Sequence, residues 1–314
     1  MANTVLQATT QEIQKMKEAY KAFIPAASPP GSIFTAKPPG CTITAYKSGK
    51  VLFQGKNAEA EALKWNIKPA PSASKPKKDK PAHAYAPPEN VGSLSLIGSD
   101  EVGTGDFFGP ITVVASYVPE SKLELLRELG VKDSKFLNDL QIVSIAKDLL
   151  HTIPYSLLVL NNRKYNELQA KGMSQGKMKA LLHNKALLHM LEKTKNEKVD
   201  GILVDQFCEP GVYFNYLSRQ STVVKDQVYF ATKGESLHLS VAASSILARY
   251  AFINEMDKIS AKTGIEIPKG AGSKVDVKAA ELIRKHGPDF LNDIAKIHFA
   301  NTKKAMNLAH GKRN

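Results

Sequence analysis

Two adjacent carboxylates, Asp100 and Glu101, stand between an apolar run and a glycine-rich turn in the segment LSLIGSDEVGTGDFFGPITVVA. Neighbouring side chains of a strand point to opposite faces, so the two acids converge on one point only where the backbone turns. Gly103 and Gly105 permit such a turn, because glycine adopts backbone conformations that other residues avoid. The pair is therefore either an exposed acidic turn or one part of a cation site.

Two further acids stand at the ends of expected strands. Asp205 closes the apolar run GILVD, and Glu235 follows a strand expected over residues 222–230 and precedes a long helix. Each acid alone also suits a helix N-cap or the positive end of a helix dipole. Because the acids come from separate strand ends of one predicted sheet, we expect that sheet to bring all of them together.

Four carboxylates in one site need protons or cations. Two ionised carboxylates ~5 Å apart repel by roughly 3 kcal/mol at an effective dielectric constant of about 20. Oxygen ligands without histidine or cysteine select Mg²⁺ or Mn²⁺ over zinc, and two divalent ions formally neutralise four carboxylates. Two such ions roughly 3.5 to 4 Å apart are the usual arrangement for in-line attack on a phosphodiester. The acids thus predict a site for two Mg²⁺ or Mn²⁺ ions.

The glycine turn does not suit a dinucleotide. VGTGDFFG lacks the third glycine of the dinucleotide fingerprint, and the acids before it would repel a pyrophosphate. Its backbone N–H and C=O groups suit a ligand that approaches closely. The ribose 2′-hydroxyl is such a ligand, since it both donates and accepts hydrogen bonds and distinguishes RNA from DNA.

Composition favours a polyanionic partner. The chain has 314 residues and a formal net charge of +13, and this widely spread excess suits nucleic acid. Cys41 and Cys208 lie far apart without a CxxC pair or a histidine at finger spacing, which argues against a zinc module and a disulfide framework. With no apolar run of about 18 residues and no signal-peptide pattern, we expect a cytoplasmic protein that does not associate with membranes.

The chain is expected to have two domains and a linker. Residues 68–92 contain six prolines, five lysines and hardly any large aliphatic side chains, so they cannot bury enough surface to fold. Before this linker, residues 1–67 predict a helix over 9–24, a β-hairpin over 41–55 that turns at Ser48 and Gly49, and a short helix over 57–67. Their eight lysines against four acids favour a binding accessory over a plain stability domain.

Residues 93–314 predict an α/β domain with a mixed sheet flanked by helices. The first two strands are separated by the glycine turn and should pair antiparallel. The helix over 236–256 is rich in small residues and can approach the sheet closely. The expected strands cover residues 94–98, 110–118, 155–160, 201–205 and 222–230, and the other expected helices cover 122–129, 138–150 and 177–191.

Four motifs resemble bacterial ribonuclease HIII, a branch of the ribonuclease HII/HIII family. They are SDEVGTGDFFGP, KDSK at 132–135, ILVDQF around Asp205 and KGESLHLSVAASSILARYAF, in this order and spacing. Ribonuclease HII proteins typically show an arginine in the turn and an aspartate as the last acid, so Gly103-Thr104-Gly105 and Glu235 favour HIII. The SGKVLFQG hairpin resembles the substrate-binding domain of HIII proteins, which is similar to a repeat of the TATA-box-binding protein.

The resemblance implies a ribonuclease H-like fold and endonucleolytic hydrolysis of the RNA strand of RNA·DNA hybrids with Mg²⁺ or Mn²⁺. The products would carry 3′-hydroxyl and 5′-phosphate ends. Two alternatives stay open: an HII-like junction endonuclease that cuts at single ribonucleotides in duplex DNA, and a non-catalytic nucleic-acid-binding protein whose acids cap structure. No obligate protein partner is evident, and we expect a monomer.

The resemblance also implies roles for individual residues. It makes the four acids Asp100, Glu101, Asp205 and Glu235 the catalytic metal ligands. The turn would contact the ribose-bearing strand through its backbone at Gly103, Thr104 and Gly105. Ser134 and Lys135 would lie near phosphates, or else would be a helix-start serine and a solvated lysine. Structural roles are expected for the histidines His183, His238 and His298.

Overall fold

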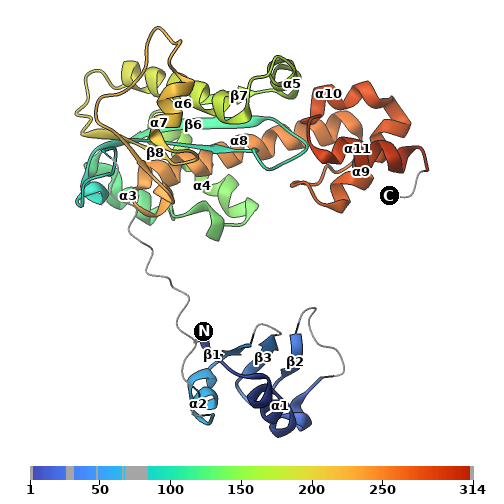
Figure 1. Cartoon of the computed structure of the whole chain (residues 1–314). Helices are drawn as coiled ribbons and strands as arrows, with labels where there is room; N and C mark the ends of the chain where they lie inside the picture. Colours follow the sequence, from blue (N-terminus) through green and yellow to red (C-terminus); the bar gives the residue numbers. More distant parts are fainter. Residues whose placement is uncertain (1–2, 26–31, 47–48, 66, 68–83, 312–314) are drawn as a thin grey trace. The chain divides into compact units, whose positions relative to one another are not determined.

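The structure is a computed structural model of the chain and describes residues 3–25, 32–46, 49–65, 67 and 84–311. The chain forms two compact units, Met1–Ala82 and His83–Asn314 (Figure 1). No helix in the described ranges is long and apolar enough to cross a membrane.

The N-terminal unit is a four-stranded antiparallel sheet with two helices. The strands follow the order β1-β4-β3-β2, and α1 and α2 pack on their apolar face. The predicted hairpin is confirmed as β3 and β4, although Ser48 of its predicted turn lies outside the described residues. The elements are β1 (Asn3–Gln7), α1 (Thr10–Ala19), η1 (Lys21–Phe23), β2 (Ser32–Ala36), β3 (Thr42–Tyr46), β4 (Lys50–Gln54) and α2 (Ala58–Leu63).

Sequence patterns did not identify two of these strands. β1 and β2 lie on either side of the predicted hairpin and pair with it, β1 with β4 and β2 with β3. The first helix ends earlier than expected, at Ala19, and a short 3₁₀ turn follows it. Its start is fixed by a capping box between Thr9 and Glu12, in which each residue bonds the backbone of the other.

The second unit has a mixed five-stranded sheet in the order β7-β6-β5-β8-β9, which confirms the predicted fold class. β5 pairs antiparallel with β6 and parallel with β8, and β9 extends the parallel side. Two of the predicted strands, β7 and β8, have their predicted limits, whereas β9 is shorter. The strands are β5 (Leu96–Val102), β6 (Ile111–Val118), β7 (Tyr155–Leu160), β8 (Gly201–Asp205) and β9 (Val228–Ala231).

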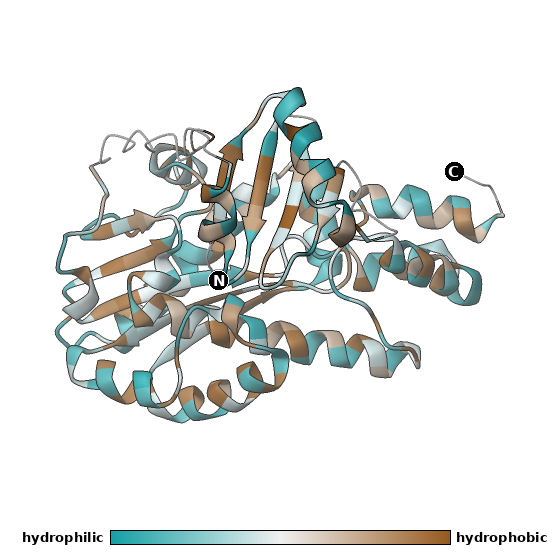
Figure 2. Ribbon diagram, turned by 90° about the horizontal axis from the view of Figure 1, so that it is seen from below, coloured by the Kyte–Doolittle hydropathy of each residue, from teal (hydrophilic) through white to brown (hydrophobic). Residues whose placement is uncertain are grey.

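Helices cover both faces of this sheet. Along β6, Val113 and Ala115 face the core under α6, while Val114 and Val118 face the core under α4 and α8 (Figure 1). The strands are largely hydrophobic, whereas the outer helices alternate hydrophobic and hydrophilic residues (Figure 2). The helices are α3 (Leu123–Glu128), α4 (Asp139–Thr152), α5 (Asn162–Ala170), α6 (Gln175–Lys193), α7 (Pro210–Tyr216), α8 (Leu239–Thr263), α9 (Ser273–His286), α10 (Leu291–Ile294) and α11 (Ala300–Ala309).

The long helix α8 approaches β5 closely, as its small residues predict. A Cβ atom on Gly98 would lie 2.2 Å from the carbonyl carbon of Ser240, so only glycine fits at this crossing. Ser244 of α8 donates a hydrogen bond to the Gly98 carbonyl oxygen at 3.0 Å. This contact fixes the start of α8 against the strand that carries Asp100 and Glu101.

The end of the predicted linker packs on the second unit. Residues 68–83 lie outside the described residues, but Tyr85 contacts Phe214 and Phe230, and its carbonyl oxygen accepts from Phe230 N. Val91, which begins the 3₁₀ turn η2 (Val91–Ser93), is buried. The aromatic and aliphatic side chains within this proline-rich stretch explain why its last residues are packed.

Candidate active site

Asp100 and Glu101 lie on opposite faces of the sheet. The expectation that the strand ends before them was wrong, because β5 stays paired with β6 as far as Val102↔Thr112. Asp100 is hydrogen-bonded to Ser245 of α8, whereas Glu101 contacts side chains of α6. Strand alternation therefore sends one carboxylate into each layer of the domain.

Asp100, Asp205 and Glu235 are brought together on the α8 side of the sheet. Asp205 ends β8, the parallel neighbour of β5, and its Oδ1 accepts from the backbone N–H of Gly234 at 2.8 Å. The next residue, Glu235, belongs to the 3₁₀ turn η5 (Gly234–Ser236), which leads into α8. Asp100 is only 5% exposed and Glu235 only 6%.

The electrostatics of this group call for a cation. Burial, followed by repulsion from Asp205 and Glu101, raises the pKa of Asp100 well above its usual range. Burial also raises the pKa of Asp205, against the opposing bond from Gly234, and repulsion from Glu101 and Glu235 adds to the rise. Positive charge beside such carboxylates favours their ionised form. Their oxygen-only donor set fits Mg²⁺ or Mn²⁺.

Glu101 is bound by two side chains of α6. Lys179 Nζ lies 2.7 Å from Glu101 Oε1, and His183 Nε2 lies 2.9 Å from Oε2. Burial raises the pKa of Glu101, but the bonds and charges of His183 and Lys179 outweigh it, so the pKa is lowered overall. The other ring nitrogen of the fully buried His183 contacts Ser99 Oγ.

His183 is thus a site residue that sequence reasoning assigned only a structural role. The signal available was the i, i+4 spacing of Lys179 and His183, which places both on one face of a helix. That spacing does not reveal which strand residue the face meets. The contact with Glu101 depends on the packing of α6 against β5.

The KDSK motif at residues 132–135 forms hydrogen bonds with Glu235. Ser134 N donates to Glu235 Oε2 at 2.8 Å, and Lys135 Nζ lies 2.9 Å from Oε1. The 3₁₀ turn η4 (Ser134–Phe136) that carries both residues is capped by Asp133, which accepts from Lys135 N. The hydrogen bond to Glu235 raises the pKa of Lys135, whose side chain is 66% exposed. Lys135 therefore reaches both Glu235 and solvent.

No ready-made metal cluster is present among the described residues. No three histidine, cysteine, aspartate or glutamate side chains there are arranged to hold an ion. Two of the acids bind lysines instead: Glu101 accepts from Lys179 and Glu235 from Lys135.

The glycine turn places its two glycines in different surroundings. Gly103 has φ +96°, and a Cβ atom there would lie 2.2 Å from the carbonyl oxygen of Pro110. At Gly105, by contrast, no atom of the described residues lies within 4 Å of an added Cβ. Between them, the Thr104 carbonyl oxygen accepts from Gln175 Nε2 at 3.1 Å. The turn is held at Gly103 and Thr104 and open at Gly105.

Comparison with known proteins identifies the family. Residues 97–302 match the family model described as Ribonuclease HII, a range that contains all four acids. Ribonuclease HIII of Bacillus mycoides (strain KBAB4) is 56% identical over 309 residues, which cover 98% of this chain and 99% of the relative. The chain belongs to the ribonuclease HIII family. It is accordingly a ribonuclease H, as its motifs predicted.

Further members of this family match the chain over nearly its whole length. Ribonuclease HIII of Bacillus licheniformis is 57% identical over 312 residues, which cover 98% of this chain and 99% of the relative. The crystal structure of Bst-RNase HIII in complex with Mn²⁺ is 44% identical, with a TM-score of 0.70, and covers 99% of this chain and 100% of that chain. Residues 3–80 match a family model described as a domain of unknown function, DUF3378.

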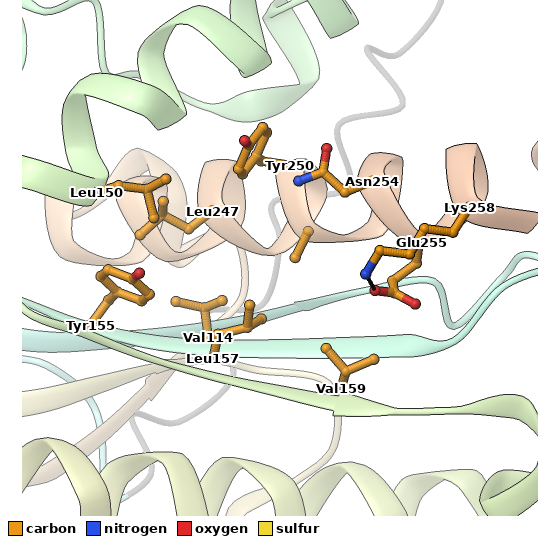
Figure 3. Close-up of a pocket in the computed structure, with 11 residues that line it drawn as sticks. Val114, Leu150, Tyr155, Leu157, Val159, Leu247, Tyr250, Asn254, Glu255 and Lys258 are labelled. Atoms are coloured by element: carbon orange, nitrogen blue, oxygen red, sulfur yellow. Dashed lines mark hydrogen bonds and ion pairs between the residues drawn. The ribbon is translucent and has the colours of Figure 1, made fainter. Parts of the chain in front are cut away.

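The enzyme also has a groove away from the acids. It lies between α8 and the strands β6 and β7 and has a cavity volume of about 260 Å³ (Figure 3). Leu157 and Val159 of the edge strand β7 line it and are 40% and 41% exposed, and a Glu255–Lys258 ion pair lies beside them. None of the predicted site residues lines this groove, so it is separate from the candidate active site.

Proposed function

We propose that the enzyme cuts the RNA strand of RNA·DNA hybrids internally and leaves 3′-hydroxyl and 5′-phosphate ends. Asp100, Glu101, Asp205 and Glu235 would hold two Mg²⁺ or Mn²⁺ ions. The main support is the group of Asp100, Asp205 and Glu235, in which Asp100 and Glu235 are buried and the raised pKa values of the two aspartates favour a neighbouring positive charge. The Mn²⁺ complex of the related Bst-RNase HIII supports the same choice of ion.

The chain's own residues prepare the acids for this reaction. When bound, two divalent ions activate water and stabilise the negative charge that develops on the phosphodiester. Lys179 and His183 hold Glu101 in its ionised form, as the lowered pKa of Glu101 indicates. Ser134 and Lys135 orient Glu235, and the exposed end of Lys135 is available to a substrate phosphate.

Recognition of the hybrid is assigned to two further parts of the chain. The backbone of Gly103, Thr104 and Gly105 would contact the ribose-bearing strand, and the open space at Gly105 supports this role. The N-terminal unit would bind the hybrid as an accessory domain, and the enzyme would act as a monomer in the cytoplasm. Deleting residues 1–67 should then raise KM and reduce the salt dependence of binding without changing the response to metal.

The principal test compares D100N and D205N with a control variant, E281Q, whose carboxylate lies on the distant helix α9. Each is assayed on an RNA·DNA hybrid with Mg²⁺ or Mn²⁺. We expect D100N and D205N to lose at least about 100-fold in kcat and E281Q to match the wild type. Activity close to wild type in either aspartate variant would refute the assignment of the site.

Two substrates and one binding assay separate the alternatives. A DNA duplex with a single ribonucleotide tests the junction endonuclease, which would cut it as efficiently as the hybrid. A non-catalytic binding protein would form no product, and divalent metal would leave its melting temperature unchanged. The proposed function predicts instead that Mn²⁺ raises the melting temperature of the wild type but raises that of D205N much less.

A further inference from the structure

Lys296 is a fully buried lysine that the proposed chemistry does not use. It lies between α10 and α11, immediately after Ala295, which forms an isolated bridge with Phe108. Its Nζ donates to the carbonyl oxygens of Asp106 at 2.9 Å and Gly109 at 2.5 Å. A third carbonyl oxygen, that of Pro110, lies 3.5 Å away.

These acceptors match an ammonium group. An ammonium has three N–H donors and no acceptor, so three carbonyl oxygens can satisfy it, and a buried charge without such partners would be very costly. Burial lowers the pKa of Lys296 to about 7, and the negative charge of Asp106 opposes this change. The ring of Tyr165 lies 5.9 Å from Nζ and adds a favourable aromatic face.

The carbonyl groups that Lys296 holds belong to the loop between β5 and β6, which continues directly from the glycine turn. Gly109 N donates to Ile294 O and Phe107 N to Gly270 O, both at 2.9 Å, so the C-terminal region anchors this loop at several points. The turn itself touches the anchored loop, because the space beside Gly103 is filled by the Pro110 carbonyl oxygen. Displacement of Pro110 would therefore loosen the packing on one side of Gly103, whose other close neighbour is the Phe252 ring.

A second side chain holds the opposite end of the same segment. Gln175, at the start of α6, donates from Nε2 to the Thr104 carbonyl oxygen and to the Tyr165 hydroxyl, both at 3.1 Å. Gln175 thus fixes the turn directly, while Lys296 fixes the loop on which the turn rests. None of the hydrogen bonds of Lys296 is made to the turn residues 103–105 themselves, so its influence is exerted through the loop.

We propose that Lys296 is a positioning residue for ribose recognition: its ammonium, by holding the carbonyls of Asp106, Gly109 and Pro110, fixes the Gly103–Gly105 turn in the conformation that reads the 2′-hydroxyl. This inference rests on the proposed function, because it presumes that the turn contacts the RNA strand. It assigns the C-terminal region, which supplies none of the proposed metal ligands, a part in substrate selection.

The test uses the full-length chain with three substitutions. K296M removes the ammonium but keeps a long unbranched side chain, and Q175M removes the direct bond to the turn at a less buried position. K122M is the matched control, because Lys122 Nζ also donates to a backbone carbonyl, that of Thr152. For each, kcat and KM are measured on an RNA·DNA hybrid, together with the ratio of hybrid to DNA duplex affinity in metal-free buffer.

We expect K296M and Q175M to raise KM by roughly 10-fold and to lower the hybrid-to-DNA affinity ratio similarly, with a smaller change in kcat. Hydrogen exchange at Phe107 and Gly109 should accelerate in K296M but not in K122M. A folded K296M with wild-type KM and affinity ratio would overturn the inference. If K296M does not fold, wild-type values in Q175M would overturn it.

The same measurements keep this inference distinct from the proposed function. A wild-type protein that cuts no hybrid refutes the proposed function. A wild type that cuts the hybrid and selects it over DNA, alongside a folded K296M that does so equally well, refutes only the role of Lys296.

Discussion

His183 Nε2 lies 2.9 Å from Glu101 Oε2 and joins the middle of α6 to the end of β5. Since Lys179 binds the other carboxylate oxygen, Glu101 is held from both sides by one face of one helix. Because we propose Glu101 as a metal ligand, His183 and Lys179 are its orienting residues, and loss of such residues typically costs about 10- to 100-fold in metal affinity or activity.

Replacing His183 by leucine should therefore weaken the metal response. We expect H183L to need roughly 10- to 100-fold more Mn²⁺ for half-maximal activity, because Glu101 loses the bond that orients it. The control is H189L on the same helix, since His189 contacts Ser156 rather than an acid. An unchanged Mn²⁺ titration in a folded H183L would show that Glu101 does not depend on this histidine.

Replacement by alanine should affect stability at Gly103 and hybrid binding at Gly105. G105A is expected to fold normally and to weaken hybrid binding, because its Cβ meets only open space that the substrate would occupy. G103A should lose on the order of 1–3 kcal/mol of stability, since its Cβ would strike the Pro110 carbonyl oxygen at a positive φ. Thermal melting and hybrid affinity measure the two effects.

The control for this pair is G211A, where an added Cβ also meets no described atom within 4 Å but lies in α7, outside the turn. It should leave hybrid affinity unchanged. Equal affinities of G105A and G211A for the hybrid would remove the argument that substrate approaches at Gly105.

Lys135 is expected to act mainly through charge. K135M should weaken hybrid binding and reduce the slope of log affinity against log salt by about 1, as loss of one phosphate contact does. K195M is the control. Lys195 lies just beyond the end of α6 and forms an exposed ion pair with Glu192 of that helix. If the salt slope of K135M equals that of the wild type, Lys135 pairs with Glu235 and does not contact a substrate phosphate.

His238 should make stability depend on pH. Burial lowers its pKa from 6.5 to about 4, so between these values the unfolded chain binds a proton that the folded chain does not. The free energy of unfolding should therefore fall as pH drops from 6.5 to 4, by on the order of 2–3 kcal/mol. Chemical denaturation of wild type and H238N across this range measures the difference.

In H238N the asparagine can still accept from Ser240 N at the start of α8, as the histidine Nδ1 does. The variant should therefore fold and lose less stability over the same pH range. Parallel pH profiles for the two proteins would contradict the assignment of this dependence to His238.

Several features were predictable because they depend on the local sequence of residues. The strands β7 and β8 are apolar runs with clear ends, and α6 and α8 have the periodicity or small residues typical of packed helices. The motifs around the four acids identified the family. β1 and β2 were missed, as were α5, α7 and the C-terminal helices. Most of these elements are short, and sequence periodicity is a weak signal over so few residues.

The sequence by itself determined which carboxylates the chain carries and that they lie at strand ends or next to them. The tertiary structure alone decided that Asp100 and Glu101 face different layers, that His183 binds Glu101, and that Lys296 reaches the loop after the glycine turn. These contacts join residues far apart in the chain, so they follow from strand register and helix packing. Such relationships depend on the whole domain, and no local pattern of residues encodes them.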